Sequence, residues 1–378
     1  MSAVTPAEAR VDLSAIAHNI GVLREHASGA EVMAVVKADG YGHGMVESAR
    51  ACLQAGATRL GAALVSEAVA LREAGFTVPI LAWIITPGES LDAAAEHGIE
   101  LSAGSTVILD RIADAARRTG RTVRVHLKVD TGISRGGAPL AAWPELLDRA
   151  AALRAEGVIE VTGLWSHFAC ADIPGHPSIA AQLEAFDEAV TQADKKGVGA
   201  DAIRHFANSA AVLTIPRARY DMVRPGIAIY GLSPIPELGD FGLRQAMTLV
   251  ARVALVKRVP AGSGVSYAHL YVTDRETTLG LVPLGYADGV MRGLSNRGEV
   301  FAAGRRRRIA GRVCMDQFVI DVGDDPLAAG DEVILFGPGD HGEPTAQEWA
   351  DSLGTITHEI VTRIGSRVPR VYRYDGVR

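Results

Sequence analysis

The feature that most constrains the fold of this chain is an alternation of short apolar runs with longer amphipathic stretches over its first two-thirds. Runs rich in β-branched residues are typical of buried parallel strands, and the stretches between them carry apolar residues at helical spacing. The expected strands are Val32–Lys37, Arg59–Leu64, Ile80–Ile85, Ile99–Ser102, Val123–Val129, Ile159–His167, Ile203–Phe206 and Met222–Arg224. The expected helices begin at the N-cap Ser14 and near Met45, Glu67, Ser90, Ser105, Ala141, Ile179 and Ser209.

A doubly wound open sheet could hold these elements, but a closed (β/α)₈ TIM barrel of about 250 residues fits their number and length best. Near Phe241 the pattern changes to strand-like segments joined by Gly, Asp and Pro turns. The expected strands there are Thr248–Val259, Thr277–Pro283, Glu299–Ala303, Arg308–Val313, Gln317–Val322 and Asp331–Phe336, with helices over Thr345–Leu353 and Thr357–Ile364. We therefore predict an α/β chain with an N-terminal barrel over residues 1–240 and a C-terminal mostly-β domain over residues 241–378. The residues before about position 10 are candidates for packing with the β domain.

The composition is that of a globular enzyme and excludes several other classes of protein. The 378 residues carry a formal net charge of −6, which argues against a nucleic-acid-binding surface. Cys52, Cys170 and Cys314 lie far apart without metal-ligand spacing, so we expect free thiols in a reducing cytoplasm and no metal. The first residues lack the pattern of a signal peptide, and the longest apolar run, Val78–Ile85, is too short to span a bilayer.

The segment Ala34–Gly44, AVVKADGYGHG, places a lysine between an apolar strand and a glycine-rich turn. In a barrel, Lys37 would stand at the C-terminal end of the first strand, where barrel enzymes keep their catalytic groups. Burial there would lower the pKa of the amine and suit it to form a Schiff base with a carbonyl compound. The alternative is a surface lysine in a turn.

This segment resembles the lysine motif of bacterial alanine racemases, which bind pyridoxal 5′-phosphate (PLP) in a barrel of fold type III and carry a second, β domain. Matching stretches follow in family order across almost the whole chain. They are His126–Gly137, Trp165–Asp172, His205–Ala211, Met222–Pro234, Val259–Ala268, Pro283–Gly289 and Gly311–Gln317. The resemblance implies interconversion of L- and D-alanine, D-alanine supply for peptidoglycan, and a homodimer with shared active sites.

The resemblance also implies two catalytic bases on opposite faces of the substrate. Lys37 resembles the Schiff-base lysine, which also acts on D-alanine, and Tyr267 resembles the base for L-alanine, contributed by the second subunit. His167 and Arg224 match residues that form a network with this tyrosine, and positive charge near a phenol lowers its pKa. Arg224 also matches the arginine that faces the PLP pyridine nitrogen. Since arginine keeps its proton, that nitrogen should stay unprotonated, which limits transamination.

The other end of the cofactor is expected to lie at the last two barrel strands, where barrels bind phosphate. Ser209 resembles the phosphate-binding serine, with Asn208 beside it. Gly226 and Ile227 match the backbone donors, and Tyr41 matches the phosphate-contacting tyrosine.

For the substrate carboxylate, the resemblance implies Arg135, whose planar guanidinium suits bidentate binding. Lys128 matches a lysine that is carbamylated in some members and then orients this arginine. Met315 matches a backbone donor from the second subunit.

One position departs from the family pattern. His358 stands where most members carry a tyrosine near the phosphate and the entrance, next to the residue matched by Tyr286. Histidine is shorter and ordinarily titrates near neutrality, so we expect an effect on cofactor affinity, entrance width and alanine preference.

Several alternatives stay open at this stage. A racemase of serine or of several amino acids would share these motifs, as would a non-catalytic PLP-binding protein, although the second domain and Tyr267 oppose the latter. A decarboxylase is disfavoured by Arg224. The basic run Arg305–Arg308 lies between strand candidates without interleaved aromatic residues, so we predict a solvated hairpin rather than a nucleic-acid contact. Zinc, Walker and dinucleotide motifs do not occur.

Overall fold

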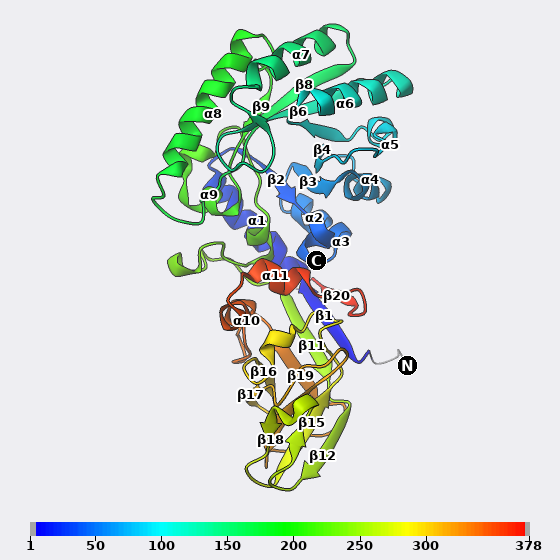
Figure 1. The fold of residues 1–378 in the computed structure, drawn as a ribbon, viewed down its shortest axis with the longest axis vertical. Coiled ribbons are helices and arrows are strands. Elements are labelled where there is room, and N and C mark those ends of the chain that lie inside the picture. Colours follow the sequence, from blue (N-terminus) through cyan, green and yellow to red (C-terminus); the bar gives the residue numbers. More distant parts are fainter. Residues whose placement is uncertain (1–4, 375–378) are drawn as a thin grey trace.

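The computed structural model describes residues 5–374. Two bodies follow one another along the long axis of the molecule (Figure 1). The upper body holds the helices α1 to α9 around a sheet, and the lower body holds mostly strands. The residues before about position 10 were expected to be candidates for packing with the β domain. Of these, residues 1–4 lie outside the described residues.

The upper body is a closed barrel of eight parallel strands. These strands are β2 (Glu31–Val35), β3 (Arg59–Leu64), β4 (Ile80–Ile84), β5 (Glu100–Ala103), β6 (Val123–Asp130), β8 (Ile159–Trp165), β9 (Ile203–His205) and β10 (Met222–Val223). The barrel closes because Met222 of β10 pairs with His205 on one side and with Glu31 on the other. The predicted barrel is therefore confirmed, and the open doubly wound sheet is wrong.

Helices cover the outside of this barrel (Figure 1). They are α1 (Leu13–Ala27), α2 (Lys37–Tyr41), α3 (Met45–Gln54), α4 (Val65–Glu73), α5 (Asp92–Glu96), α6 (Thr106–Thr119), α7 (Trp143–Ala155), α8 (Ser178–Lys195) and α9 (Ser209–Thr214). The predicted cap of α1 is wrong: the side chain of Asp12, not of Ser14, accepts the N–H groups of Ser14 and Ala15. Helix α6 begins near Ser105 as expected, and the side chain of Ser105 caps it.

The lower body is built on a six-stranded sheet in the order β17-β16-β19-β11-β1-β20. Its strands are β1 (Ala7–Asp12), β11 (Met247–Arg252), β16 (Glu299–Ala302), β17 (Arg305–Arg308), β19 (Glu332–Phe336) and β20 (Arg370–Arg373). Strand β1 precedes the barrel in the chain but pairs antiparallel with β11 and parallel with β20. The chain thus begins in the sheet of the β body before it enters the barrel.

The remaining elements complete the β body. A second sheet joins β12 (Leu255–Val259), β15 (Thr277–Val282) and β18 (Phe318–Gly323). A two-stranded ribbon joins β13 (Gly264–Val265) to β14 (Tyr271–Val272). The helices α10 (Ala346–Leu353) and α11 (Thr357–Thr362) follow these strands in the chain. The single strand predicted over Thr248–Val259 is wrong: it is broken between Arg252 and Leu255, because β11 and β12 belong to different sheets. The strand predicted over Arg308–Val313 is also wrong, since β17 ends at Arg308 and only a bridge at Ile309 follows.

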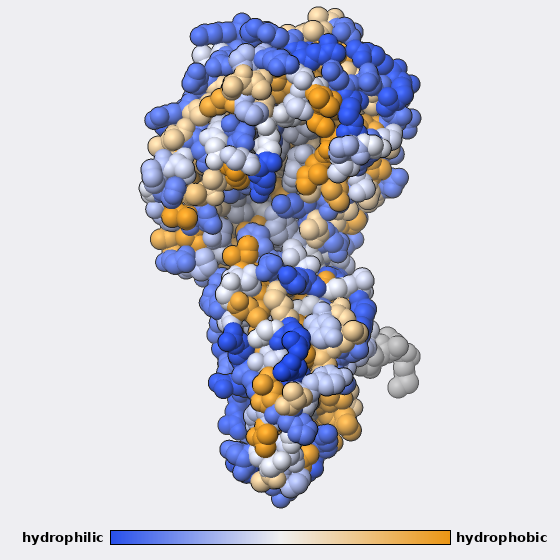
Figure 2. All heavy atoms as spheres, viewed as in Figure 1, coloured by the Kyte–Doolittle hydropathy of each residue, from blue (hydrophilic) through white to orange (hydrophobic). Residues whose placement is uncertain are grey.

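The outer surface is largely hydrophilic, with a hollow on the face of the barrel body that is turned to the viewer (Figure 2). Within residues 5–374, no helix combines the length and the apolar character needed to traverse a bilayer.

Candidate active site

A left-handed turn places Lys37 at the end of strand β2. Ala38, Asp39, Gly40 and Tyr41 all have positive φ, between 52° and 61°. Such backbone costs about 1–2 kcal/mol for each residue other than glycine, so the surroundings must stabilise it. The Glu67 carboxylate accepts the Ala38 N–H at 2.7 Å, and the Asp39 carboxylate accepts the Met45 N–H at 2.9 Å. These contacts hold the lysine in place just beyond the strand.

The Lys37 amine lies among aromatic rings and positive charges. Its Nζ is 5.8 Å from the centre of the Tyr41 ring and 5.9 Å from that of Trp83. Burial lowers the pKa of Lys37 below its ordinary value, and the charge of Arg135 adds to this effect. A lower pKa raises the share of neutral amine, the form that acts as a nucleophile or a base.

Three further cations surround this amine. Lys128 Nζ lies 4.2 Å from the centre of the Trp165 ring, and the Arg224 guanidinium carbon lies 4.7 Å from that centre. Burial lowers the pKa of Lys128 to about 8, with contributions from the charges of Arg224 and Arg135. The structure therefore brings together Lys37, Lys128, Arg135 and Arg224, which makes the barrel mouth strongly positive.

Arg224 is fully enclosed beneath this mouth. Its Nη1 donates to His205 Nδ1 at 2.9 Å, and its Nη2 donates to the carbonyls of Ser166 at 2.8 Å and Phe206 at 3.1 Å. His167 Nδ1 lies 3.5 Å from Nη2, so the predicted proximity of these two residues is observed. Burial lowers the pKa of Arg224 to about 9, which leaves it charged at neutral pH. Burial and the Arg224 charge lower the pKa of His167, which keeps that ring neutral.

The segments after β9 and β10 form a cradle of backbone and hydroxyl groups. Ser209 Oγ accepts the N–H groups of Gly226 at 2.8 Å and Ala228 at 3.3 Å, which leaves its own proton to donate outward. The Gly226 N–H predicted to face a phosphate is thus engaged by Ser209, whereas the Ile227 N–H has no acceptor within residues 5–374. Tyr41 Oη packs on Gly226, where a Cβ would approach it to 2.2 Å. Gly226 is therefore needed for close approach.

Asn208 does not face this cradle with its side-chain oxygen. Its Oδ1 accepts the Ala211 N–H at 3.1 Å and caps helix α9. Its position directly before Ser209 fixes the start of the helix and thereby the serine hydroxyl.

Helix α11 brings His358 from the β body to the barrel mouth. The centre of its ring lies 6.0 Å from that of Tyr41, and its buried Nδ1 has no hydrogen-bond partner among the described residues. Burial, aided by the charge of Lys37, lowers the pKa of His358 to about 4. The expectation that this side chain titrates near neutrality is therefore wrong, because its ring is desolvated.

Three predicted residues lie apart from the barrel group. Tyr267, in the short turn Tyr267–His269, is 69% exposed, and Met315 and Tyr286 are also exposed. They surround Cys314: the Tyr286 N–H donates to the Cys314 carbonyl, and Ser266 Oγ lies 3.4 Å from Cys314 Sγ. Among the described residues, no hydrogen bond joins these three side chains to the barrel mouth.

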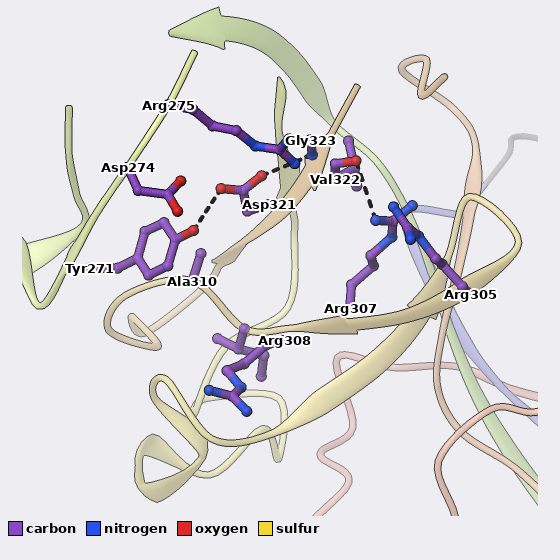
Figure 3. A pocket seen from close by; sticks show the side chains of 11 residues that line it. Tyr271, Asp274, Arg275, Arg305, Arg307, Arg308, Ala310, Asp321, Val322 and Gly323 are labelled. Carbon is purple, nitrogen blue, oxygen red and sulfur yellow. Dashed lines mark hydrogen bonds between the residues drawn. The ribbon is translucent and has the colours of Figure 1, made fainter. Parts of the chain in front are cut away.

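Three residues of the basic run, Arg305, Arg307 and Arg308, line a pocket in the β body (Figure 3). The predicted hairpin exists, since β17 pairs with β16. However, Arg307 is buried and donates to the carbonyls of Ala302 and Val322 and to Asp325. The expectation of a fully solvated run is therefore wrong at Arg307, whose charge is paired inside the fold.

The sequence reasoning did not single out Trp165 or His205. Trp165 underlies both Lys128 and Arg224, and its ring stacks on that of His205, with centres 5.6 Å apart. Both lie inside matched motifs and pair with each other across β8 and β9. The alternation of side chains along a strand would have placed them on the inner face.

A closed parallel barrel with a half-buried lysine and three further cations at its strand ends, followed by a β body, is the architecture of an α/β-barrel enzyme. Models of the alanine racemase N-terminal and C-terminal domains match residues 11–234 and 246–372. The chain belongs to the alanine racemase family, whose members depend on PLP.

Full-length relatives support this assignment. The chain is 61% identical to the alanine racemase of Frankia casuarinae, in an alignment that covers 96% of this chain and 95% of the relative. It is also 61% identical to the alanine racemase of Thermobifida fusca, in an alignment that covers 97% of this chain and 98% of the relative. The solved structure of alanine racemase from Streptomyces lavendulae, a D-cycloserine producer, superposes with a TM-score of 0.97 at 52% identity, covering 100% of this chain and 99% of that one.

Proposed function

We propose that this chain is a PLP-dependent racemase that interconverts L- and D-alanine. The observation that carries the proposal is the convergence of Lys37, Lys128, Arg135 and Arg224 at one end of the barrel. So many cations in a partly buried space require anions to compensate them. A cofactor phosphate and a substrate carboxylate supply such charges. The family and the names of the relatives favour alanine over the other substrates considered above.

The residues present fit PLP. Three polar groups suit the phosphate end, because each can form a further hydrogen bond that no group among the described residues takes up. They are the Ser209 hydroxyl, the Ile227 N–H and the buried Nδ1 of His358. Asn208, Tyr41 and Gly226 would shape that end. Bound PLP supplies an electron-withdrawing ring that acidifies the substrate Cα proton. The Arg224 guanidinium can only donate and would keep the ring nitrogen unprotonated.

Two bases would move the proton at Cα. The lowered pKa of Lys37 supports its role as the base on one face. Tyr267 would serve on the other face, near the positive charge of Arg224 and the neutral ring of His167 beside it. Because Tyr267 is exposed on the β body, we infer that it enters the site of a second copy of the chain. Met315 and Tyr286 lie on the same surface and would enter with it.

Substrate orientation would fall to Arg135 through its bidentate guanidinium. The pKa of about 8 leaves part of Lys128 neutral, and only a neutral amine can take up CO₂, so carbamylation of this lysine is part of the proposal. D-alanine made here would supply peptidoglycan. We also propose a cytoplasmic location, since Cys52, Cys170 and Cys314 are free thiols. The proposed domain division is residues 1–240 and 241–378, with the strand Ala7–Asp12 packing in the sheet of the second domain.

The test combines chemical labelling with subunit mixing. Borohydride reduction and peptide mapping should find the pyridoxyl group on Lys37, in a protein that racemises alanine. Lys37→Ala and Tyr267→Phe should each be inactive, while a mixture refolded together should recover about a quarter of wild-type activity, because half of the dimers then contain one intact site. Tyr271→Phe, a tyrosine that donates to Asp321, is the matched control and should stay active. A label on another lysine, or no recovery on mixing, refutes the proposal.

A further inference from the structure

A chain of hydrogen bonds runs through the barrel interior beneath Arg224. From His205 on β9, which accepts from Arg224, the chain continues over 2.8 Å to His126 Nδ1 on β6. His126 Nε2 then lies 2.9 Å from Glu100 Oε2 at the start of β5. Both histidine rings are fully buried, and Glu100 is 2% exposed. The chain thus connects the barrel mouth to the opposite end of the strands through buried side chains.

The hydrogen bonds in this chain can point in only one direction. A guanidinium has no acceptor, so His205 Nδ1 must accept from Arg224 and carry no proton. A neutral imidazole carries one proton, which places it on His205 Nε2 and makes His126 Nδ1 the acceptor. His126 therefore carries its proton on Nε2 and donates it to Glu100. The hydrogen bonds thus place both rings in the same tautomer, with Nδ1 accepting and Nε2 donating.

Glu100 ends the chain as a carboxylate. Its Oε1 lies 3.2 Å from Arg124 Nε, and its Oε2 lies 3.4 Å from Arg59 Nη1 in addition to the His126 contact. Burial favours the neutral acid, but the His126 hydrogen bond and the charges of Arg59 and Arg124 outweigh it and lower the pKa of Glu100. A fixed negative charge thus stands at the far end of two polarisable rings.

Gly163 on β8 makes this chain sterically feasible. A Cβ at this position would lie 2.2 Å from His126 Nδ1 and 2.5 Å from Cγ of the same ring. Real Cβ atoms do not approach ring atoms so closely, so any larger residue would displace the atom that accepts from His205. The glycine has no positive φ, so its role here is space rather than backbone freedom.

We propose that Glu100 and His126 are positioning residues of the racemase, which act through His205 to hold the Arg224 guanidinium in one orientation beneath the cofactor. The inference deepens the proposed function, since it assumes that Arg224 faces the PLP ring. Aligned hydrogen bonds in a low-dielectric interior strengthen one another. The carboxylate therefore favours the charged, fixed form of Arg224 without touching the ligand. Without it, Arg224 could rotate and admit a proton to the ring nitrogen.

The first experiment reads the tautomers directly and does not depend on activity. The full-length protein as purified, labelled with ¹⁵N-histidine, should show two neutral rings protonated on Nε2 that disappear separately in His126→Gln and His205→Gln. The His205 signal should persist unchanged when the pH is lowered from 8 to 6, because burial lowers the pKa of that ring. A doubly protonated ring, or an Nδ1–H tautomer, at either position overturns the relay. This result stands even if the chain proves not to racemise alanine.

The second experiment measures the consequence for Arg224. Glu100→Gln keeps an acceptor for His126 but removes the charge. We expect kcat to fall about 10- to 100-fold, the range found for residues that orient metal ligands from the outer shell. KM for alanine should change less than twofold, and pyruvate formed per racemisation event should rise at least threefold. Glu343→Gln is the control, since Glu343 is equally buried in the β body and accepts backbone N–H groups there.

Gly163→Ala provides a second route to the same result without removing a relay residue. It should displace the His126 resonance and raise the pyruvate ratio like Glu100→Gln, whereas Gly21→Ala, where a Cβ meets nothing within 4 Å, should do neither. A loss of kcat in Glu100→Gln with the pyruvate ratio of wild type would reduce Glu100 to a structural residue and refute the inference. Absence of racemisation in the wild-type protein would instead refute the proposed function.

Discussion

The left-handed turn after Lys37 leads to an unusual prediction about stability. Alanine-to-glycine substitutions in helices destabilise proteins, yet Ala38 is assigned to the short helix α2 and has φ of 52° and ψ of 52°. Its side chain is exposed, so Ala38→Gly removes no packing. The Ala38 N–H that donates to Glu67 is kept.

The magnitude follows from two opposing terms. Relief of the left-handed conformation is worth about 1–2 kcal/mol, and the greater freedom of glycine in the unfolded chain costs about 0.5–1 kcal/mol. Ala38→Gly should therefore leave the free energy of unfolding unchanged or raise it by up to about 1.5 kcal/mol. Ala152→Gly, at an exposed position in the regular helix α7, should lower it by about 1 kcal/mol.

The assay is urea unfolding at pH 7 followed by tryptophan fluorescence, which reports on Trp83, Trp143 and Trp165 of the barrel. The midpoint of the barrel transition should move to higher urea, or stay, in Ala38→Gly and move to lower urea in Ala152→Gly. An equal loss of stability in both variants would mean that Ala38 does not occupy left-handed backbone. The explanation of how Lys37 is held would then fail.

Three further predictions concern the site. Arg224→Glu should increase pyruvate formation relative to racemisation, measured with lactate dehydrogenase, because a carboxyl can protonate the ring nitrogen; an unchanged ratio would reject this role. His358→Tyr should tighten PLP binding, measured as a dissociation constant after dialysis, because a phenol reaches further toward the Ser209 cradle; an equal or weaker affinity contradicts this. Between pH 6.5 and about 4, His358 is protonated in the unfolded chain but not in the folded chain. As the pH is lowered through this range, the free energy of unfolding should therefore decrease by up to about 3 kcal/mol because of this group. The decrease should be smaller in His358→Tyr.

The barrel was predictable because its strands are buried on both faces and its helices carry clear caps. Val123–Val129 was expected as a strand and is β6, and a helix was expected to begin near Ser105, where α6 begins. The wrong predictions concern a helix start and a strand break, where the local sequence is compatible with two structures. Asp12 and Ser14 are both good caps, and only tertiary placement selects Asp12. The break inside Thr248–Val259 separates two sheets, which alternation along one strand cannot reveal.

The site was predictable only in part, for a physical reason. Lys37 and Arg224 stand at strand ends, and the closed barrel brings strand ends together. The neutral state of His358 depends on burial by residues distant in sequence, and the pairing of Arg307 with Asp325 depends on packing in the β body. Glu100, His126 and Gly163 carry no local signal, because their relation appears only when β5, β6, β8 and β9 are side by side.

The placement of β1 has a consequence for how the chain is made. During synthesis β1 emerges before the barrel, whereas its partners β11 and β20 follow the whole barrel. Until they emerge, Ala7–Asp12 is a strand with two unpaired edges attached to a nascent barrel, and such edges invite pairing with other chains. Synthesis should therefore be the stage at which this protein is most prone to aggregate, and a chaperone that binds extended segments should raise its yield.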